Sequence, residues 1–148
     1  MVYVFVNIKW HTIDGNQMGT VVNIFDSYNP LNTVLKGFTI KNGYNNEGAG
    51  IYAYGNGIVL SDLIVRNNTG VGDLDGGGAS INGDINIINT VFNDNIGRKG
   101  GALLMSSGSP LIENCQFFNN NCTEAGAVFM IMNCNPTIKN ALIVNNGN

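Results

Sequence analysis

The apolar positions of this chain fall in short runs separated by glycine and asparagine, and two patterns recur at intervals of about 25 residues. One joins small residues to an apolar run, at Gly48–Ile51, Gly77–Ser80, Gly100–Leu103 and Ala125–Val128. The other places an apolar residue three positions before an asparagine, at Ile64–Asn67, Phe92–Asn95, Phe117–Asn120 and Ile143–Asn146. A period of this length is typical of solenoids and propellers, in which each repeat buries its apolar face against its neighbours.

The runs between these patterns have the composition of short β-strands. Ile58–Leu60, Ile85–Ile88 and Leu111–Ile112 are rich in β-branched residues and bounded by turn formers. Three such strands and three turns per repeat predict one coil of a right-handed, single-stranded parallel β-helix, with coils stacked at roughly 4.8 Å. A propeller blade would need about 40–45 residues, and a leucine-rich repeat would need spaced leucines. We therefore expect an all-β solenoid of about five coils of about 25 residues.

Composition supports a turn-rich solenoid. The chain has 148 residues, of which 20 are glycine, and 11% are charged, against roughly 25% in an average domain. Glycine and asparagine tolerate the left-handed backbone conformation of tight turns. We expect one β-helix domain over residues 1–148, with an irregular coil over 1–34 and regular coils over 35–148. Residues 1–10 resemble an apolar strand without a polar capping unit, so a segment of a longer solenoid is expected.

Stacking the repeats predicts columns of equivalent residues. Two columns are rich in asparagine: Asn67, Asn95, Asn120 and Asn146, and Ser61, Asn89, Asn114 and Asn140. An asparagine column is either an internal turn ladder, in which stacked amides satisfy one another, or an exposed stripe that binds a ligand. We favour the internal ladder.

Two further columns follow from the same alignment. Phe92 and Phe117 are expected to stack, with Ile64 and Ile143 continuing the apolar line. Arg66 and Asp94 are expected to occupy the same outward position in consecutive coils and to form an ion pair, with Lys41 preceding them.

These residues carry a family resemblance. Gly100–Leu103 with Phe92–Asn95 and Phe117–Asn120 resemble the GGA[ILV] and FxxN tetrapeptides of the polymorphic outer-membrane protein repeats of surface autotransporters. The stretches Ile13–Asn16, Gly37–Gly43 and Gly50–Tyr52 resemble secreted β-helix proteins of the pectin-lyase-like superfamily. The resemblance implies a β-helix in a secreted, cell-surface or outer-membrane protein, and it implies no particular activity, because one fold hosts unrelated functions.

Candidate chemistry is sparse. His11 is the only histidine, and no Ser or Cys nucleophile is recognisable beside it. The loop Gly72–Gly77 carries two aspartates that could bind calcium, but it lacks the spacing of an EF-hand. Arg98–Lys99 is typical of a solubilising turn. No catalytic residue, metal site or cofactor is therefore predicted, and the sequence leaves enzymatic activity open while favouring a non-catalytic role.

Three cysteines, Cys115, Cys122 and Cys134, occupy different positions within the repeat. Their number is odd and their spacing matches no zinc signature. We expect structural or free thiols, with Cys115 buried as a small hydrophobic residue.

One strand suggests a binding surface. In Ile51–Gly55, alternation directs Ile51 and Ala53 to the core and Tyr52 and Tyr54 outward. There the two tyrosines could stack on sugar rings, but we favour single exposed aromatics or side chains that cover a neighbouring coil. The run Val128–Met132 is apolar on both faces and could contact a protein. The net charge of −3 argues against nucleic acid and anionic membranes as partners. No apolar stretch is long enough to span a membrane.

Two functions remain open from the sequence. The favoured one is a non-catalytic cell-surface or secreted scaffold of the adhesin or passenger type, with polysaccharides or host-surface proteins as partners. The alternative is part of a polysaccharide-degrading enzyme, a pectate lyase or glycoside hydrolase, whose catalytic residues are not evident in this sequence.

Overall fold

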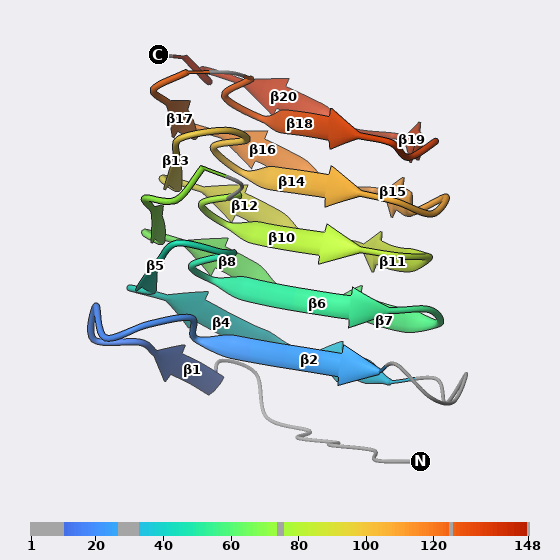
Figure 1. Ribbon diagram of the computed structural model, residues 1–148, viewed down its shortest axis with the longest axis horizontal. Helices are drawn as coiled ribbons and strands as arrows, with labels where there is room; N and C mark the ends of the chain where they lie inside the picture. Colours follow the sequence, from blue (N-terminus) through green and yellow to red (C-terminus); the bar gives the residue numbers. More distant parts are fainter. Residues whose placement is uncertain (1–10, 27–32, 74–75, 125, 148) are drawn as a thin grey trace.

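The computed structural model is a right-handed parallel β-solenoid, as the repeat predicts (Figure 1). It describes residues 11–26, 33–73, 76–124 and 126–147. Over these residues the chain contains strands and turns but no helix. Every strand pairing that it forms is parallel, and each joins a strand to its equivalent in the next turn. Residues 1–10, where an apolar strand is expected, lie outside the described residues.

Four parallel sheets run along the solenoid axis. The first sheet comprises β1 (His11–Asp14), β4 (Phe38–Lys41), β8 (Ile64–Arg66), β12 (Val91–Asn93), β16 (Gln116–Phe118) and β20 (Leu142–Val144). The second comprises β2 (Val22–Asp26), β6 (Ile51–Gly55), β10 (Ala79–Asn82), β14 (Leu103–Ser106) and β18 (Phe129–Met132). The third comprises β3 (Val34–Lys36), β7 (Ile58–Ser61), β11 (Ile85–Ile88), β15 (Leu111–Glu113) and β19 (Thr137–Lys139). The fourth, narrow sheet comprises β5 (Tyr44–Asn45), β9 (Thr69–Gly70), β13 (Ile96–Gly97) and β17 (Asn121–Cys122).

Apolar columns fill the space between the sheets. Phe92 and Phe117 are register partners and fully buried, and their rings stack with centroids 5.2 Å apart and an interplanar angle of 8°, as predicted. Phe129 meets the Phe117 ring edge-on at 4.8 Å. Similar columns run through Leu60, Ile87 and Ile112, and through Ala53, Ile81 and Met105. The core is therefore a continuous file of side chains, each in contact with its equivalents in adjacent turns.

A buried column of amides runs beside the aromatic stack. This asparagine ladder consists of Asn68, Asn95, Asn120 and Asn146. In each step both the backbone N–H and the side-chain Nδ2 of one asparagine donate to Oδ1 of the next, over 2.8–3.1 Å. Nδ2 also donates to a backbone carbonyl of the preceding turn, such as that of Val65 for Asn95. The internal ladder predicted from the sequence is confirmed.

The membership of the ladder differs from the prediction by one residue. Asn68, and not Asn67, occupies the buried position. The step from Asn68 to Asn95 spans 27 residues and that from Asn95 to Asn120 spans 25, so the spacing is not constant from turn to turn. Asn67 is exposed at φ 55°, and Val65, and not Ile64, stacks on Phe92. Adjacent asparagines allow two alignments, and only the structure distinguishes them.

The prediction for the second asparagine column is also wrong by one residue in its earliest turn. Asn89, Asn114 and Asn140 share positive φ angles of 49–55°, and the equivalent residue of the earlier turn is Asp62, not Ser61. These side chains are exposed, and their contacts run from Asn89 Nδ2 to Asp62 and from Asn140 Nδ2 to Asn114. The column therefore forms left-handed corner positions on the outside of the solenoid, where asparagine and aspartate are tolerated.

The predicted pairing of Arg66 with Asp94 is wrong. Arg66 is the register partner of Asn93, and Asp94 lies one position further on, in a turn at φ 54°. Lys41 does share the column of Arg66, but its partner is Asp14 in the preceding turn, at 3.0 Å. The error has the same origin as that in the ladder.

Close approach of neighbouring turns explains the small-residue pattern. A Cβ atom on Gly78 would lie 2.5 Å from the carbonyl oxygen of Ala102 and 2.9 Å from the Phe92 ring. At Gly50, Gly77 and Gly101 an added Cβ would likewise overlap backbone carbonyls of adjacent turns. Glycine is therefore required here because the backbones approach too closely for any larger residue.

Replacing a ladder asparagine tests the packing. Asn95→Ala or Asn120→Ala should lower the free energy of unfolding by about 1–3 kcal/mol, because buried N–H groups of the adjacent turn lose their acceptor. Asn146→Ala should cost less, because Asn146 has a ladder neighbour on one side only. Urea unfolding measures the effect. Asn119→Gly, an exposed neighbour at φ 55°, is the control. Equal and negligible effects at all ladder positions would contradict the interpretation.

The role of close approach can be tested at Gly78. Gly78→Ala should destabilise the fold by about 1–3 kcal/mol, because the methyl group overlaps the adjacent turn. Gly147→Ala is the matched control, since an added Cβ there meets nothing within 4 Å. A Gly78→Ala protein that melts together with the Gly147→Ala protein would contradict this explanation.

Asp14 should give the fold a pH-dependent contribution. Its pKa is lowered to about 2, first by the backbone N–H of Asn16 and then by the side chains of Lys41 and Asn42. Because the folded pKa lies below the ordinary value of about 3.9, the ionised group stabilises the fold above about pH 4, and this is lost as the pH falls towards 2. The stability difference between the native protein and Asp14→Asn should therefore shrink over this window. An NMR titration of Asp14 with an ordinary midpoint would contradict it.

Candidate functional site

The outward alternation predicted for strand β6 is confirmed. Ile51 and Ala53 are fully buried, whereas Tyr52 is half-buried and Tyr54 is 41% exposed. Both tyrosines therefore belong to the outer surface of the second sheet, whose strands face the viewer in Figure 1.

Two outward rows cross this sheet from turn to turn. The register places Tyr52 beside Ser80 and then Leu104, and the second row is Tyr54, Asn82, Ser106 and Met132. Ser80 is the position at which the small-residue pattern lacks its apolar residue. A small side chain between a tyrosine and a leucine leaves a gap in the row.

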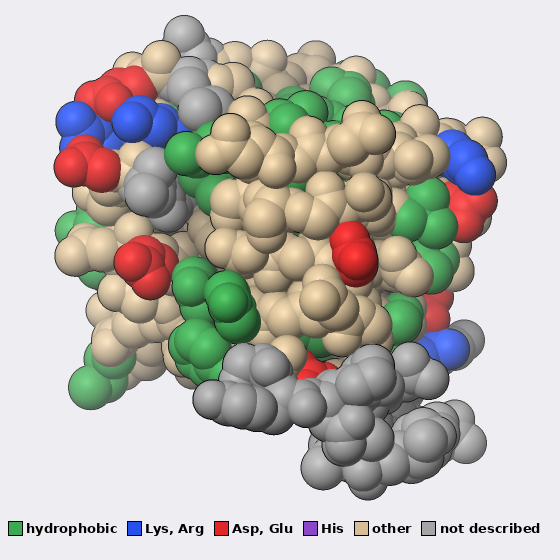
Figure 2. All heavy atoms as spheres, turned by 45° about the vertical axis from the view of Figure 1, so that its right-hand side comes forward, with side chains coloured by type: hydrophobic (Ala, Val, Ile, Leu, Met, Phe, Trp, Pro, Cys, Tyr) green, Lys and Arg blue, Asp and Glu red, His purple; other side chains and the backbone are tan. Residues whose placement is uncertain are grey.

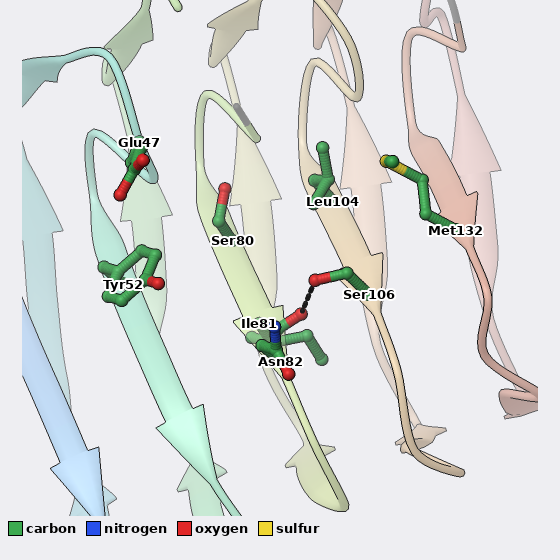
Figure 3. A pocket seen from close by; sticks show the side chains of 8 residues that line it. All are labelled: Glu47, Tyr52, Ser80, Ile81, Asn82, Leu104, Ser106 and Met132. Atoms are coloured by element: carbon green, nitrogen blue, oxygen red, sulfur yellow. Dashed lines mark hydrogen bonds between the residues drawn. The ribbon is translucent and has the colours of Figure 1, made fainter. Parts of the chain in front are cut away.

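A hollow of about 140 Å³ lies over this part of the sheet, although Ser80 and Leu104 are themselves only 4% exposed (Figure 3). We call it the Tyr52 notch. It spans four consecutive turns, with Tyr52 in the first of them. The residues that line it are Glu47, Tyr52, Ser80, Ile81, Asn82, Leu104, Ser106 and Met132.

Hydrogen bonds fix the polar groups in the notch. Ser80 Oγ accepts from the backbone N–H of Gly76 at 2.7 Å, and Ser106 Oγ donates to the carbonyl oxygen of Ile81 at 3.3 Å. Asn82 Oδ1 accepts from the hydroxyl group of Ser107 at 2.5 Å. The notch thus combines one aromatic wall with hydroxyl and amide groups held in defined orientations.

Tyr52 stays protonated over the physiological range. Burial raises the pKa of its phenol above the ordinary value, and the nearby carboxylate of Glu47 raises it further. Figure 3 shows Glu47 reaching from the turn before β6 to the edge of the notch above Tyr52. The phenol therefore remains a hydrogen-bond donor, and Glu47 supplies a full negative charge beside it.

A third aromatic residue, missed in the sequence, supports Tyr52. Phe25 of β2 is 68% exposed, and its ring centroid lies 5.3 Å from that of Tyr52. Its register partner is Tyr54, which lies on the same face but outside the notch lining. The proximity of Phe25 depends on the β2–β6 register in the region predicted to be an irregular coil, where no repeat pattern indicates it.

A second hollow, of about 360 Å³, lies beside the first. It is lined by Asn46, Glu47, Val71, Gly72, Asp73 and Arg98. The Arg98 guanidinium binds the carboxylates of Asp73 and Glu124, the latter at 2.6 Å. Figure 2 shows acidic and basic side chains clustered at two opposite edges of this face and few charged groups between them. Arg98, predicted to be a solubilising residue, thus links two turns.

The remaining candidate residues do not converge on the notch. His11 lies on the first sheet, with its ring centroid 6.1 Å from that of Phe38. In the Gly72–Gly77 loop Asp73 pairs with Arg98, while Leu74 and Asp75 lie outside the described residues. Among the described residues no three His, Cys, Asp or Glu side chains are grouped to hold a metal ion.

The cysteines have structural environments. Cys115 is buried in a corner column, and its Sγ contacts the carbonyl oxygens of Ile87 and Glu113 at 3.5 and 3.3 Å. Burial raises the pKa of this thiol, which disfavours the reactive thiolate. None of the three cysteines forms a disulfide. The prediction that Cys115 packs as a small hydrophobic residue is confirmed.

The apolar run ending at Met132 is divided between two surfaces. Met132 lines the notch. Ile131 continues a core column, yet its side chain is 47% exposed, and Ile143 is similarly exposed, at 50%. These two residues lie in the last described turn, which has a neighbouring turn on one side only. No helix long and apolar enough to span a membrane occurs in the part of the chain that the structure describes.

Comparisons with family models, with curated proteins and with solved structures find no match to this chain. The site is therefore interpreted from its own geometry and chemistry.

Proposed function

We propose that this chain is a non-catalytic β-helix segment of a cell-surface or secreted protein that binds a glycan at the Tyr52 notch. The observation that carries the proposal is the gap at Ser80, which leaves the Tyr52 ring as a wall beside a small hollow lined by both apolar and polar groups. Tyr54 and Phe25 extend the aromatic surface next to it.

The lining matches the chemistry of a sugar ring. A pyranose has a weakly polar face of C–H groups and a rim of hydroxyl groups. Tyr52 can stack against the former, and Asn82 and Ser106 offer amide and hydroxyl groups to the latter, whereas Ser80 is only 4% exposed and its Oγ accepts from Gly76. Binding sites for small ligands commonly combine apolar walls with a few oriented polar groups. The hydrogen bonds of the serines and the asparagine supply that orientation.

The charge inventory of the notch favours binding over catalysis. Glycoside hydrolysis ordinarily needs two carboxylates on either side of the bond that breaks. Of the residues that line the notch, Glu47 alone carries a carboxylate, and no histidine, lysine or arginine accompanies it. An acid and base pair for a lyase or a hydrolase is therefore missing from this lining.

A location at the cell surface or outside the cell is supported by the resemblance of the repeated sequence motifs to polymorphic outer-membrane protein repeats and to secreted pectin-lyase-like proteins. A solenoid with few charged residues and an outer face of aligned rows suits an extended scaffold of the passenger type. The pectin-lyase-like resemblance also supports the alternative, a segment of a polysaccharide-degrading enzyme whose catalytic groups lie elsewhere.

Truncation of Tyr52 tests the proposal. Tyr52→Ala should weaken binding of the best oligosaccharide from a glycan array by about tenfold, or about 1.4 kcal/mol, because the stacking wall is removed. Tyr54→Ala should have a smaller effect, since Tyr54 lies outside the notch lining. Isothermal titration calorimetry provides the affinities, and Tyr44→Ala, an exposed tyrosine on the fourth sheet, is the control.

Two results would overturn the proposal. Binding that survives Tyr52→Ala unchanged would remove the notch from the site. Release of unsaturated or reducing sugar from pectin or alginate by the native chain would establish the enzymatic alternative.

A further inference from the structure

The lining of the Tyr52 notch contains an acidic residue and no basic one. Glu47 is the only charged residue in its lining. The five strands of this sheet carry no lysine or arginine, and Asp26 ends the first of them. The basic residues within the described ranges all lie on other sheets or in turns: Lys36, Lys41, Arg66, Arg98, Lys99 and Lys139.

Arg98, the cation in the adjoining hollow, has carboxylate partners other than Glu47. Arg98 binds Asp73 and Glu124, so this group of three carries one positive and two negative charges. Lys36 and Lys41 are held by Asp62 and Asp14 on other sheets. Within the lining of the notch, the charge that a ligand meets is therefore that of Glu47, at its edge.

The field of Glu47 acts on the notch itself. The carboxylate contributes to the raised pKa of the Tyr52 phenol, so the two groups are close enough to interact. A ligand group beside Tyr52 would experience the same negative charge. A carboxylate there would be repelled, whereas an ammonium group would be attracted to Glu47 and to the face of the tyrosine ring.

We infer that the notch selects neutral and amino-substituted sugars over uronates and that Glu47 is the residue that determines this specificity. The inference rests on the proposed glycan binding. It predicts a preference opposite to that expected for binding of pectin or alginate, which are polymers of uronates.

A matched pair of ligands isolates the charge. Tetragalacturonic acid and its methyl ester share a backbone and differ in the charge of their carboxyl groups. At about 10 mM salt, the ester should bind the native chain about fivefold more tightly than the acid, the size expected for one repulsion across a few ångströms of water. At about 500 mM salt the ratio should approach one, because exposed charges are screened. Glucosamine oligomers should likewise bind more tightly than their N-acetylated forms.

Two substitutions assign the preference to Glu47. Glu47→Gln should remove most of the difference between ester and acid, and Glu47→Lys should reverse it. Glu113→Gln is the control, because it removes the same charge from the third sheet, away from the notch lining. Glu47 lies in an exposed turn, so circular dichroism should show an unchanged fold for its variants.

The outcomes separate the two proposals. The inference would be overturned, and glycan binding left in place, by either of two results. One is Tyr52-dependent binding with equal affinity for ester and acid, and the other is an effect of Glu113→Gln as large as that of Glu47→Gln. Absence of binding to every oligosaccharide tested would overturn the proposed function, and the inference with it.

Discussion

A buried amide must find partners for both its N–H groups and its oxygen, and this requirement governs the solenoid. The asparagine ladder meets it by stacking: Oδ1 of Asn120 accepts from the backbone and the side chain of Asn95, whose Nδ2 also reaches the carbonyl of Val65. Such bonds form only if each turn follows the last at the spacing of adjacent parallel strands. The ladder therefore fixes register at one corner. The aromatic stack of Phe92 and Phe117 lies beside it and follows the same spacing.

With the interior register fixed, the outer rows are free to vary. Leu104 and Tyr52 are bulky and Ser80 is small, although all three occupy one row above equally buried core positions. The notch is thus a difference among side chains on an invariant backbone. Tyr52 and Leu104 belong to strands that are paired on both sides, and Met132 lies on the edge strand β18, so most of the site is held by the same inter-turn hydrogen bonds as the core. A rigid site of this kind pays little conformational entropy on binding.

The repeat and the inward–outward alternation could be predicted because they arise from local patterns: β-branched runs, turn formers and the period of the chain. The register across Asn67 and Asn68 could not, because either asparagine satisfies the pattern and only burial distinguishes them. The same one-residue ambiguity made three other predictions wrong: the stacking of Ile64 on Phe92, the place of Ser61 in the second asparagine column, and the partner of Arg66. At the site, alternation alone predicted Tyr52. The contribution of Phe25 depends on how the first turn lies against the next, in a stretch without the repeat, and that of Glu47 depends on the path of the turn that precedes Gly48–Ile51.

The direction of the inter-turn hydrogen bonds has a mechanical consequence. They join each turn to the next, along the solenoid axis, and no described strand pairs within its own turn. Tension along that axis would load the bonds of the terminal turn first, so the chain would peel one turn at a time at modest force, as a zipper opens. Turns that remain stacked keep their edge strands and the free end of the ladder, which form a template for the released turn to recoil. A solenoid built this way is expected to extend under load and to refold turn by turn when the load is released.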